Sequence, residues 1–116
     1  MSDFSYLNVD NAYKLINQKV TKTPLVTNDY INNLLEAEIY FKLENLQNTG
    51  SFKLRGATHK ITKLIETVKD SGVVAYSSGN HAQAVAYASM INSISAKIIM
   101  PKTAPQIKIE NTKNYG

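Results

Sequence analysis

The sequence predicts an α/β fold: a three-layer open sheet, mostly parallel, in the order βαβαβα, with helices on both faces. Two observations predict it. Short apolar runs suited to strands alternate along the chain with longer segments of helical periodicity. That alternation is typical of a parallel sheet whose crossover connections are helices. Gly72 and Pro101 separate these segments and mark where a helix and a strand end.

Length and composition suit one small globular domain. The chain has 116 residues, of which 43% are hydrophobic and 19% charged. The net charge of +4 is spread along the chain, which favours a solvated surface over a nucleic-acid interface. The absence of cysteine excludes disulfides and thiolate metal sites. Because neither a membrane span nor a signal peptide is visible, we expect a soluble cytoplasmic protein that binds neither membrane nor nucleic acid.

The N-terminal part, residues 1–38, is predicted to be a helix followed by a linker. Apolar residues recur near helical spacing over 10–20, behind a possible cap at Asp10. Pro24 ends this helix because it forces the residue before it into extended geometry. A short helical turn is expected around residues 34–35.

The remainder, residues 39–116, is predicted to be a small α/β domain that is truncated at its C-terminal end. Apolar residues alternate over 38–44, which predicts a strand. A long amphipathic helix is expected over 52–69 because its apolar residues recur three and four apart. An apolar strand follows at 73–76.

Three further elements complete the predicted order: a helix over 80–91, a strand over 96–100 and a last helix over 104–114. Ligands of parallel sheets bind beyond the carboxyl ends of the strands, at the strand-to-helix turns. Two polar motifs of this sequence fall at such turns.

The first motif is NTGSFKLRGA, residues 48–57. Gly50 allows a tight turn, and Ser51 is a good candidate for the helix N-cap. Lys53 then falls near the positive end of the helix dipole, where its pKa should be lowered, the more so with some burial. An uncharged lysine amine is a nucleophile that condenses with an aldehyde to a Schiff base.

Plainer interpretations of this motif remain open. Lys53 has the alternative of an ordinary surface lysine beside a helix cap. Arg55 is expected to form an ion pair or to pack rather than to catalyse. Gly56 has the alternative of a site where helix and strand pack closely.

The second motif is SSGNHAQA, residues 77–84, which follows one predicted strand and opens the next helix. Hydroxyl, amide and free backbone N–H groups at a helix start make an anion site suited to a small carboxylate. His81 is either an acid or base, or a structural histidine that bonds a nearby carbonyl. No metal site is expected, because His59 and His81 have no obvious partner ligands.

These stretches together resemble a known family. KLENLQNTGSFKLRGA (42–57), SSGNHAQA (77–84), TPL (23–25) and MPKTAPQIK (100–108) are similar to the N-terminal part of the serine/threonine dehydratases and their close relatives, the serine racemases. These are pyridoxal-phosphate enzymes of fold type II, the tryptophan-synthase-β type. The resemblance runs from about residue 10 to residue 116.

The resemblance implies a role for each motif residue. Lys53 would hold pyridoxal 5'-phosphate as a Schiff base and later move the α-proton of the substrate. Phe52 would pack beside the cofactor, and Asn80 would bond its ring hydroxyl. The loop that grips the substrate carboxylate would comprise Ser77, Ser78, Gly79, Asn80 and His81.

The activity implied is α,β-elimination of L-threonine or L-serine to a 2-oxo acid and ammonia. Many dehydratases carry alanine where this chain has Ser78, which acts as an acid in the racemase branch, so serine racemisation is an alternative. A non-catalytic remnant that acts as a binding module is another. Family members hold the cofactor phosphate in a later run of glycines, so this chain alone is expected to be a fragment without activity. Full-length members are expected to be homo-oligomers.

Overall fold

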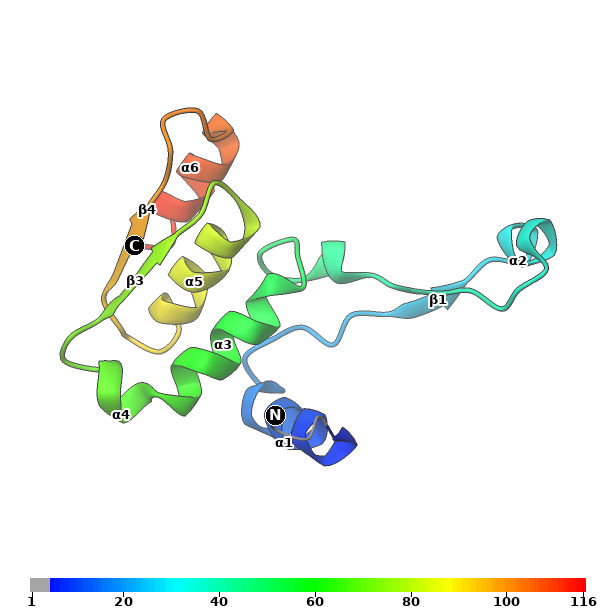
Figure 1. Ribbon diagram of the computed structural model, residues 1–116, viewed down its shortest axis with the longest axis horizontal. Helices are drawn as coiled ribbons and strands as arrows, with labels where there is room; N and C mark the ends of the chain where they lie inside the picture. Colours follow the sequence, from blue (N-terminus) through cyan, green and yellow to red (C-terminus); the bar gives the residue numbers. More distant parts are fainter. Residues whose placement is uncertain (1–4) are drawn as a thin grey trace.

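The computed structural model describes residues 5–116 and consists of a packed α/β body from which a thin arm extends (Figure 1). The body contains the helices α1 (Tyr6–Ile16), α3 (Lys53–Lys63), α4 (Ile65–Val68), α5 (Asn80–Met90) and α6 (Gln106–Lys113) and the strands β3 (Val73–Tyr76) and β4 (Ala96–Ile99). The arm contains β1 (Leu25–Thr27), α2 (Asp29–Leu35) and β2 (Tyr40–Lys42). The principal extents are 52 × 37 × 28 Å, and the arm accounts for much of the longest one. In the described part of the chain, no helix has both the length and the apolar character that crossing a membrane requires.

Helix α1 (Tyr6–Ile16) starts earlier than the sequence predicts. The hydroxyl of Ser5 caps it by accepting from the backbone N–H of Asn8, so the predicted cap at Asp10 is wrong. Asp10 instead lies inside the helix, where its carboxylate pairs with Lys14 at 2.6 Å. The helix docks against α3 through Ile16, its one buried residue.

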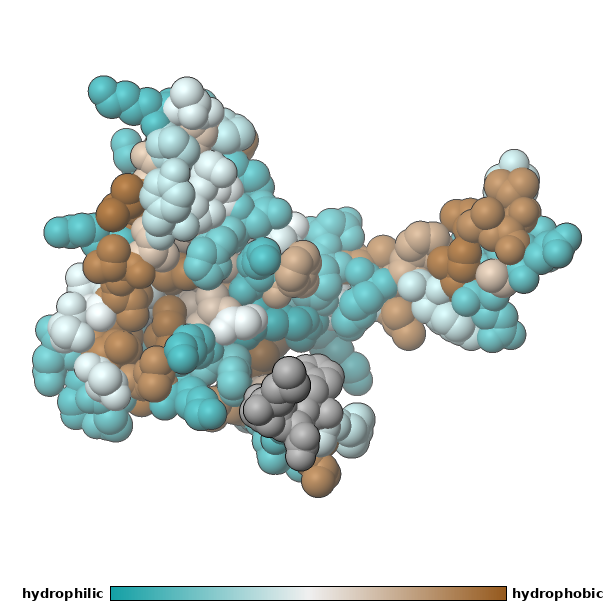
Figure 2. Space-filling model, viewed as in Figure 1, coloured by the Kyte–Doolittle hydropathy of each residue, from teal (hydrophilic) through white to brown (hydrophobic). Residues whose placement is uncertain are grey.

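The arm is an antiparallel pair of short strands with a helix at its tip. Strand β1 (Leu25–Thr27) pairs with β2 (Tyr40–Lys42), and α2 (Asp29–Leu35) connects them. The strand predicted at 38–44 therefore forms, but it pairs with β1 and not with the parallel sheet. Apolar side chains cover much of the arm (Figure 2), and those more than half exposed are Leu25, Tyr30, Leu34, Leu35 and Tyr40.

Helix α3 (Lys53–Lys63) and the short α4 (Ile65–Val68) replace the single helix predicted over 52–69. The break falls at Leu64, whose backbone leaves helical geometry with φ −102° and ψ 13°. The apolar face predicted for this segment is confirmed, since α3 buries Leu54, Ala57 and Ile61.

Strands β3 (Val73–Tyr76) and β4 (Ala96–Ile99) form a parallel pair in which Val73 faces Ala96 and Tyr76 faces Ile99. Helix α5 (Asn80–Met90) makes the crossover between them, and α6 (Gln106–Lys113) follows β4 and packs on α5. These four elements lie within about two residues of their predicted ends, which confirms the α/β class.

The helices cover one face of this sheet. Val73, Ala75 and Ile98 point into the core, where α3 and α5 supply most of the buried apolar residues. On the opposite face, Val74 is 70% exposed and Tyr76 72% exposed. The prediction of helices on both faces is therefore wrong for the described residues, whose parallel sheet has two strands.

Gly72 forms the turn that feeds β3 and is the glycine whose replacement we expect to be most harmful to the fold. Its φ is +73°, and a Cβ there would lie 2.6 Å from the carbonyl oxygen of Ser95. That same oxygen accepts the N–H of Val73 at 2.9 Å, so it cannot move away without loss of a ladder hydrogen bond. Gly72→Ala should lower the free energy of unfolding by about 2–3 kcal/mol, measured by urea unfolding.

Gly56→Ala is the matched control. Gly56 lies within α3, and nothing is within 4 Å of the position of its Cβ, so the close packing considered for it is wrong. Alanine is the better helix former, and this variant should be neutral or up to about 1 kcal/mol more stable. Equal losses in both variants would contradict the assignment of Gly72 as a sterically required glycine.

Candidate functional site

The first motif forms a turn and the first residues of α3. Gly50 has φ +69°, as a tight turn requires. Phe52 already has helical backbone angles and precedes Lys53, the first residue of α3. The predicted Ser51 cap is wrong: its backbone carbonyl accepts the N–H of Leu54 at 3.5 Å, while its buried hydroxyl has no hydrogen-bond partner among residues 5–116.

Lys53 is exposed, so the burial expected for its side chain is also wrong. Its Nζ lies 4.9 Å from the centroid of the Phe52 ring, a cation–π contact. Within residues 5–116, no carboxylate forms an ion pair with this amine; the ion pairs there involve Lys14, Arg55 and Lys69. The amine is therefore accessible to a ligand.

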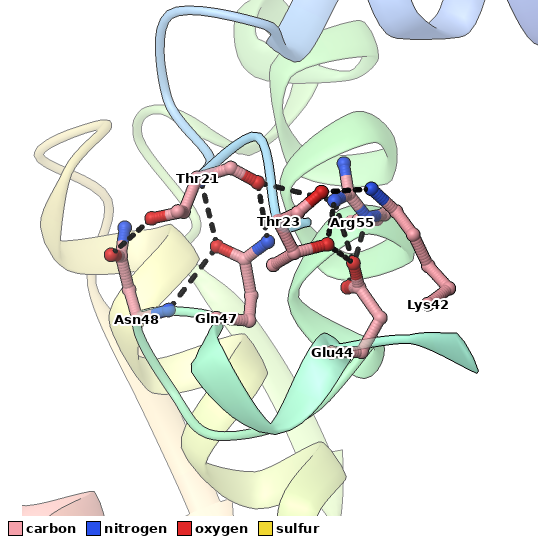
Figure 3. A network of polar contacts seen from close by, with 7 residues as sticks. All are labelled: Thr21, Thr23, Lys42, Glu44, Gln47, Asn48 and Arg55. Carbon is pink, nitrogen blue, oxygen red and sulfur yellow. Dashed lines mark hydrogen bonds and ion pairs between the residues drawn. The ribbon is translucent and has the colours of Figure 1, made fainter. Parts of the chain in front are cut away.

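A polar network fixes the backbone on either side of the Lys53 turn (Figure 3). Glu44, in the 3-10 helix η1 (Glu44–Leu46), accepts two hydrogen bonds from Arg55, at 2.9 Å from Nε and 2.7 Å from Nη2. The same carboxylate accepts from Thr23 Oγ1 at 2.5 Å. This confirms the expectation that Arg55 forms an ion pair. The pair joins the two ends of the segment 44–55, which contains Lys53.

Further contacts extend this network to the segment after α1. Gln47 is buried, and its amide exchanges two hydrogen bonds with the backbone of Thr21, at 2.8 and 2.9 Å. Arg55 Nη2 donates to the carbonyl of Thr21 at 3.1 Å, and Lys42 Nζ to that of Thr23 at 2.5 Å. Two segments that precede α3 in the sequence, 21–23 and 42–47, are therefore joined to each other and, through Arg55, to the first turn of α3.

Glu44 is the member of this network whose titration is affected. Its side chain is 14% exposed and that of Arg55 25%. The hydrogen bond from the Arg55 guanidinium holds the pKa of Glu44 below its ordinary value, although partial burial acts in the opposite direction. Sequence reasoning missed Glu44; the signal available was that Arg55 is the only arginine and needs an acidic partner nearby.

The second motif forms the turn between β3 and α5. The Ser77 hydroxyl accepts the N–H of Gly79 at 3.2 Å, and the N–H of Ser77 donates to the carbonyl of Ile99 at 3.1 Å. Gly79 occupies the N-cap position of α5 and offers no side-chain cap. The first N–H groups of α5 are therefore available to an anion.

Asn80 and His81 open α5, and both are exposed. Asn80 Oδ1 accepts a hydrogen bond from Lys108 Nζ of α6 at 2.8 Å. His81 lies along a groove of about 300 Å³ between α3 and β3 that is also lined by Lys60 and Gly56. In the part of the chain described, no His, Cys, Asp and Glu side chains gather in threes as a metal site would need.

The two motifs lie at the starts of neighbouring helices. Helices α3 and α5 are in contact and run in roughly the same direction (Figure 1). Lys19 links the C-terminal ends of the two helices, since its Nζ donates to Thr62 Oγ1 at 3.2 Å and to Asn92 Oδ1 at 2.6 Å. Among residues 5–116, no hydrogen bond joins Lys53 directly to the Ser77–His81 turn.

Comparison with known proteins identifies the family. A family model described as pyridoxal-phosphate dependent enzyme matches residues 16–116. The chain belongs to this family of pyridoxal-phosphate dependent enzymes. Pyridoxal 5'-phosphate is therefore its cofactor, as predicted.

Two curated relatives and one solved structure illustrate the similarity. The serine racemase of Dictyostelium discoideum is 43% identical over 116 residues, which are 100% of this chain and 36% of that protein. The biosynthetic L-threonine dehydratase of Lactococcus lactis subsp. lactis is 50% identical over 108 residues, 93% of this chain and 26% of that protein. The crystal structure of the Dictyostelium discoideum serine racemase gives a TM-score of 0.89 at 44% identity and covers 95% of this chain.

The chain spans about a third of the length of these relatives: it covers 36% of the Dictyostelium discoideum serine racemase in the crystal structure. The structural match confirms the fold type II class. The division at residue 38 into a linker and a small domain stays a prediction.

The residues present fit part of the cofactor. The aldehyde of pyridoxal phosphate requires an accessible amine, which Lys53 presents without a competing acidic partner in the described chain. Asn80 presents amide N–H groups, and the uncapped start of α5 presents backbone N–H groups. No two glycines are adjacent in this sequence, so a glycine-rich cup for the phosphate is not among these residues.

Proposed function

We propose that the whole protein is a pyridoxal-phosphate-dependent ammonia-lyase that converts L-threonine or L-serine to a 2-oxo acid and ammonia. The observation that carries the proposal is the exposed Lys53 amine at the start of α3, which has no ion-pair partner among the described residues, in a chain of this family. Relatives named threonine dehydratase and serine racemase support an amino acid with a β-hydroxyl as substrate.

The bound cofactor supplies an electron sink for the carbanion chemistry at the substrate Cα. In this proposal, Lys53 Nζ holds the cofactor, and the freed amine then takes the α-proton. Phe52, next to that amine, packs against the ring. Loss of the α-proton and of the β-hydroxyl, followed by addition of water, leaves the 2-oxo acid and ammonia.

The turn between β3 and α5 holds the substrate carboxylate in this proposal. Backbone N–H groups of Ser78, Asn80 and His81 face it, and α5 has no side-chain N-cap that would compete for them. The Ser77 hydroxyl keeps the turn in shape through its bond to Gly79. Asn80 donates to the ring oxygen of the cofactor.

The direct test is turnover by the full-length protein loaded with pyridoxal phosphate. L-Threonine and L-serine are supplied separately, and 2-oxo acid and ammonia are both quantified. Equal amounts of the two products from at least one substrate are expected. A loaded protein that yields neither product from either substrate would remove the ammonia-lyase proposal.

Serine racemisation is the second candidate, and the Ser77–Ser78 pair favours it. Ser78 is exposed at the turn and its hydroxyl has no partner in the described chain, which leaves it free to act as an acid toward a substrate. Ser78→Ala in the full-length protein should lower D-serine formation from L-serine by about 10²-fold, because general acid catalysis is worth about that much. Formation of 2-oxo acid should change only a few-fold.

Chiral chromatography measures D-serine, and Ser77→Ala is the comparison. Ser77 shapes the turn through Gly79, so its loss should lower both activities together. Racemisation is ruled out if the unchanged protein makes no D-serine, and the role of Ser78 is ruled out if Ser78→Ala makes as much as the unchanged protein.

A further inference from the structure

Helix α6 meets α5 through two polar contacts with the same spacing on both helices. Lys108 Nζ donates to Asn80 Oδ1 at 2.8 Å, and Asn111 Nδ2 donates to Gln83 Oε1 at 3.2 Å. In each helix the two residues are three apart and so lie on one face. Gln83 is only 2% exposed, so the second contact anchors the register of the two helices. That register brings Lys108 to the start of α5.

Lys108 is not committed to any other group among the described residues. Glu110, the one acidic residue of α6, accepts instead from Gln106 Nε2 at 2.9 Å. The Lys108 backbone carbonyl accepts from Thr112 Oγ1 at 2.7 Å, which adds a hydrogen bond within α6. The ammonium of Lys108 therefore contacts an amide oxygen in place of a carboxylate.

The chemistry of this contact determines which way the Asn80 amide faces. An ammonium can only donate hydrogen bonds, so the amide must turn its oxygen to Lys108. The Nδ2 group, with two N–H donors, is then directed elsewhere, and no residue in the described chain accepts from it. Without Lys108 the amide could rotate by half a turn and present its oxygen in place of its N–H groups.

We propose that Lys108 is a positioning residue for the cofactor: it orients Asn80 so that the amide donates to the ring oxygen of pyridoxal phosphate. This inference rests on the role of Asn80 in the proposed function. The ring oxygen is an acceptor, so only the orientation imposed by Lys108 matches it. The positive charge on the amide oxygen also polarises the amide and strengthens its N–H groups as donors.

The test uses the full-length protein and the dissociation constant of pyridoxal phosphate, measured without substrate from the visible absorbance of the bound cofactor. Lys108→Met should weaken cofactor binding about tenfold, the effect of losing one oriented charge-assisted hydrogen bond. Lys108→Arg keeps a donor toward Asn80 Oδ1 and should restore the constant to within a few-fold. Lys113→Met, on the same helix and exposed, is the control and should bind as the unchanged protein does.

A second variant separates orientation from a merely structural role. Asn80→Asp keeps an acceptor for Lys108, and strengthens that contact to an ion pair, but has no N–H to donate. Its melting temperature should be unchanged or higher, whereas cofactor binding should fall at least as far as in Lys108→Met. If Asn80→Asp binds the cofactor normally, the inference is wrong.

A double variant completes the experiment. In an Asn80→Ala background, Lys108→Met should cause no further loss, because Lys108 acts through the amide. A further tenfold loss there, or unchanged binding in Lys108→Met alone, would overturn the inference. Borohydride labelling of Lys53 in the unchanged protein tests the proposed function separately from the role of Lys108. If Lys53 is not labelled, the proposed function fails and the inference fails with it. If Lys53 is labelled, the binding constants of the variants test the role of Lys108 alone.

Discussion

Lys53→Ala should lower the turnover of the full-length protein with L-threonine or L-serine by at least about 10³-fold. The amine at this position is proposed both to hold the cofactor and to move the α-proton, so a single truncation removes two functions. Its exposed position, with the cation–π contact to Phe52 as its one described interaction, implies little effect on folding. The rate of 2-oxo acid formation and the visible absorbance of the cofactor are the two measurements.

Lys60→Ala is the matched control for this prediction. Lys60 is an exposed lysine of the same helix, about two turns from Lys53, and its side chain has no hydrogen bond or ion pair in the described chain. Its loss should leave both measurements within about twofold. Turnover that survives Lys53→Ala, or that falls equally in Lys60→Ala, would contradict the catalytic role proposed for Lys53.

Glu44→Gln should destabilise the fold by about 2–3 kcal/mol at pH 7, because it removes the charge from a bidentate, largely buried pair with Arg55. Urea unfolding measures this difference. Because the Glu44 pKa is lowered in the folded protein, the pair stabilises fully above the ordinary glutamate pKa of 4.5. Its contribution is lost as the pH falls from there through the folded value, so the difference between variant and unchanged protein should shrink below about pH 4.5.

Glu66→Gln supplies the comparison for an exposed ion pair. Glu66 pairs with Lys69 at 2.6 Å, but the two side chains are 81% and 52% exposed. Such a pair should contribute less than about 0.5 kcal/mol. Equal effects of the two substitutions, or a Glu44→Gln effect that persists undiminished in acid, would contradict the role given to the polar network.

The elements that the sequence predicts well are those set by local patterns. Strand β3 is an apolar run that follows the positive-φ turn at Gly72, and Pro101 ends β4, so their bounds are nearly those of the structure. The pairing of β2 with β1 could not be predicted from the sequence. Strand β1 has only three residues and no alternating burial pattern, and the whole of α2 lies between the two strands in the sequence. The amphipathic pattern likewise continues through Leu64, where the backbone breaks α3 from α4.

The candidate site shows the same distinction between features set by local sequence patterns and features set by contacts between distant residues. Placement of both motifs at helix starts follows from the chain order of strands and helices. The exposure of Lys53, the burial of Ser51 and the contact of Lys108 with Asn80 depend on how helices pack, which single-sequence patterns do not encode. The direct contact between Lys108 and Asn80 spans 28 positions in the sequence.

The central claim, that the amine of Lys53 carries the cofactor, is tested most directly by chemical trapping. The full-length protein is incubated with pyridoxal phosphate and reduced with borohydride, and the peptide that carries the pyridoxyl group is identified by mass spectrometry. The account predicts one stoichiometric label, on Lys53. A label that resides on another lysine, or is scattered over several exposed ones, would contradict it.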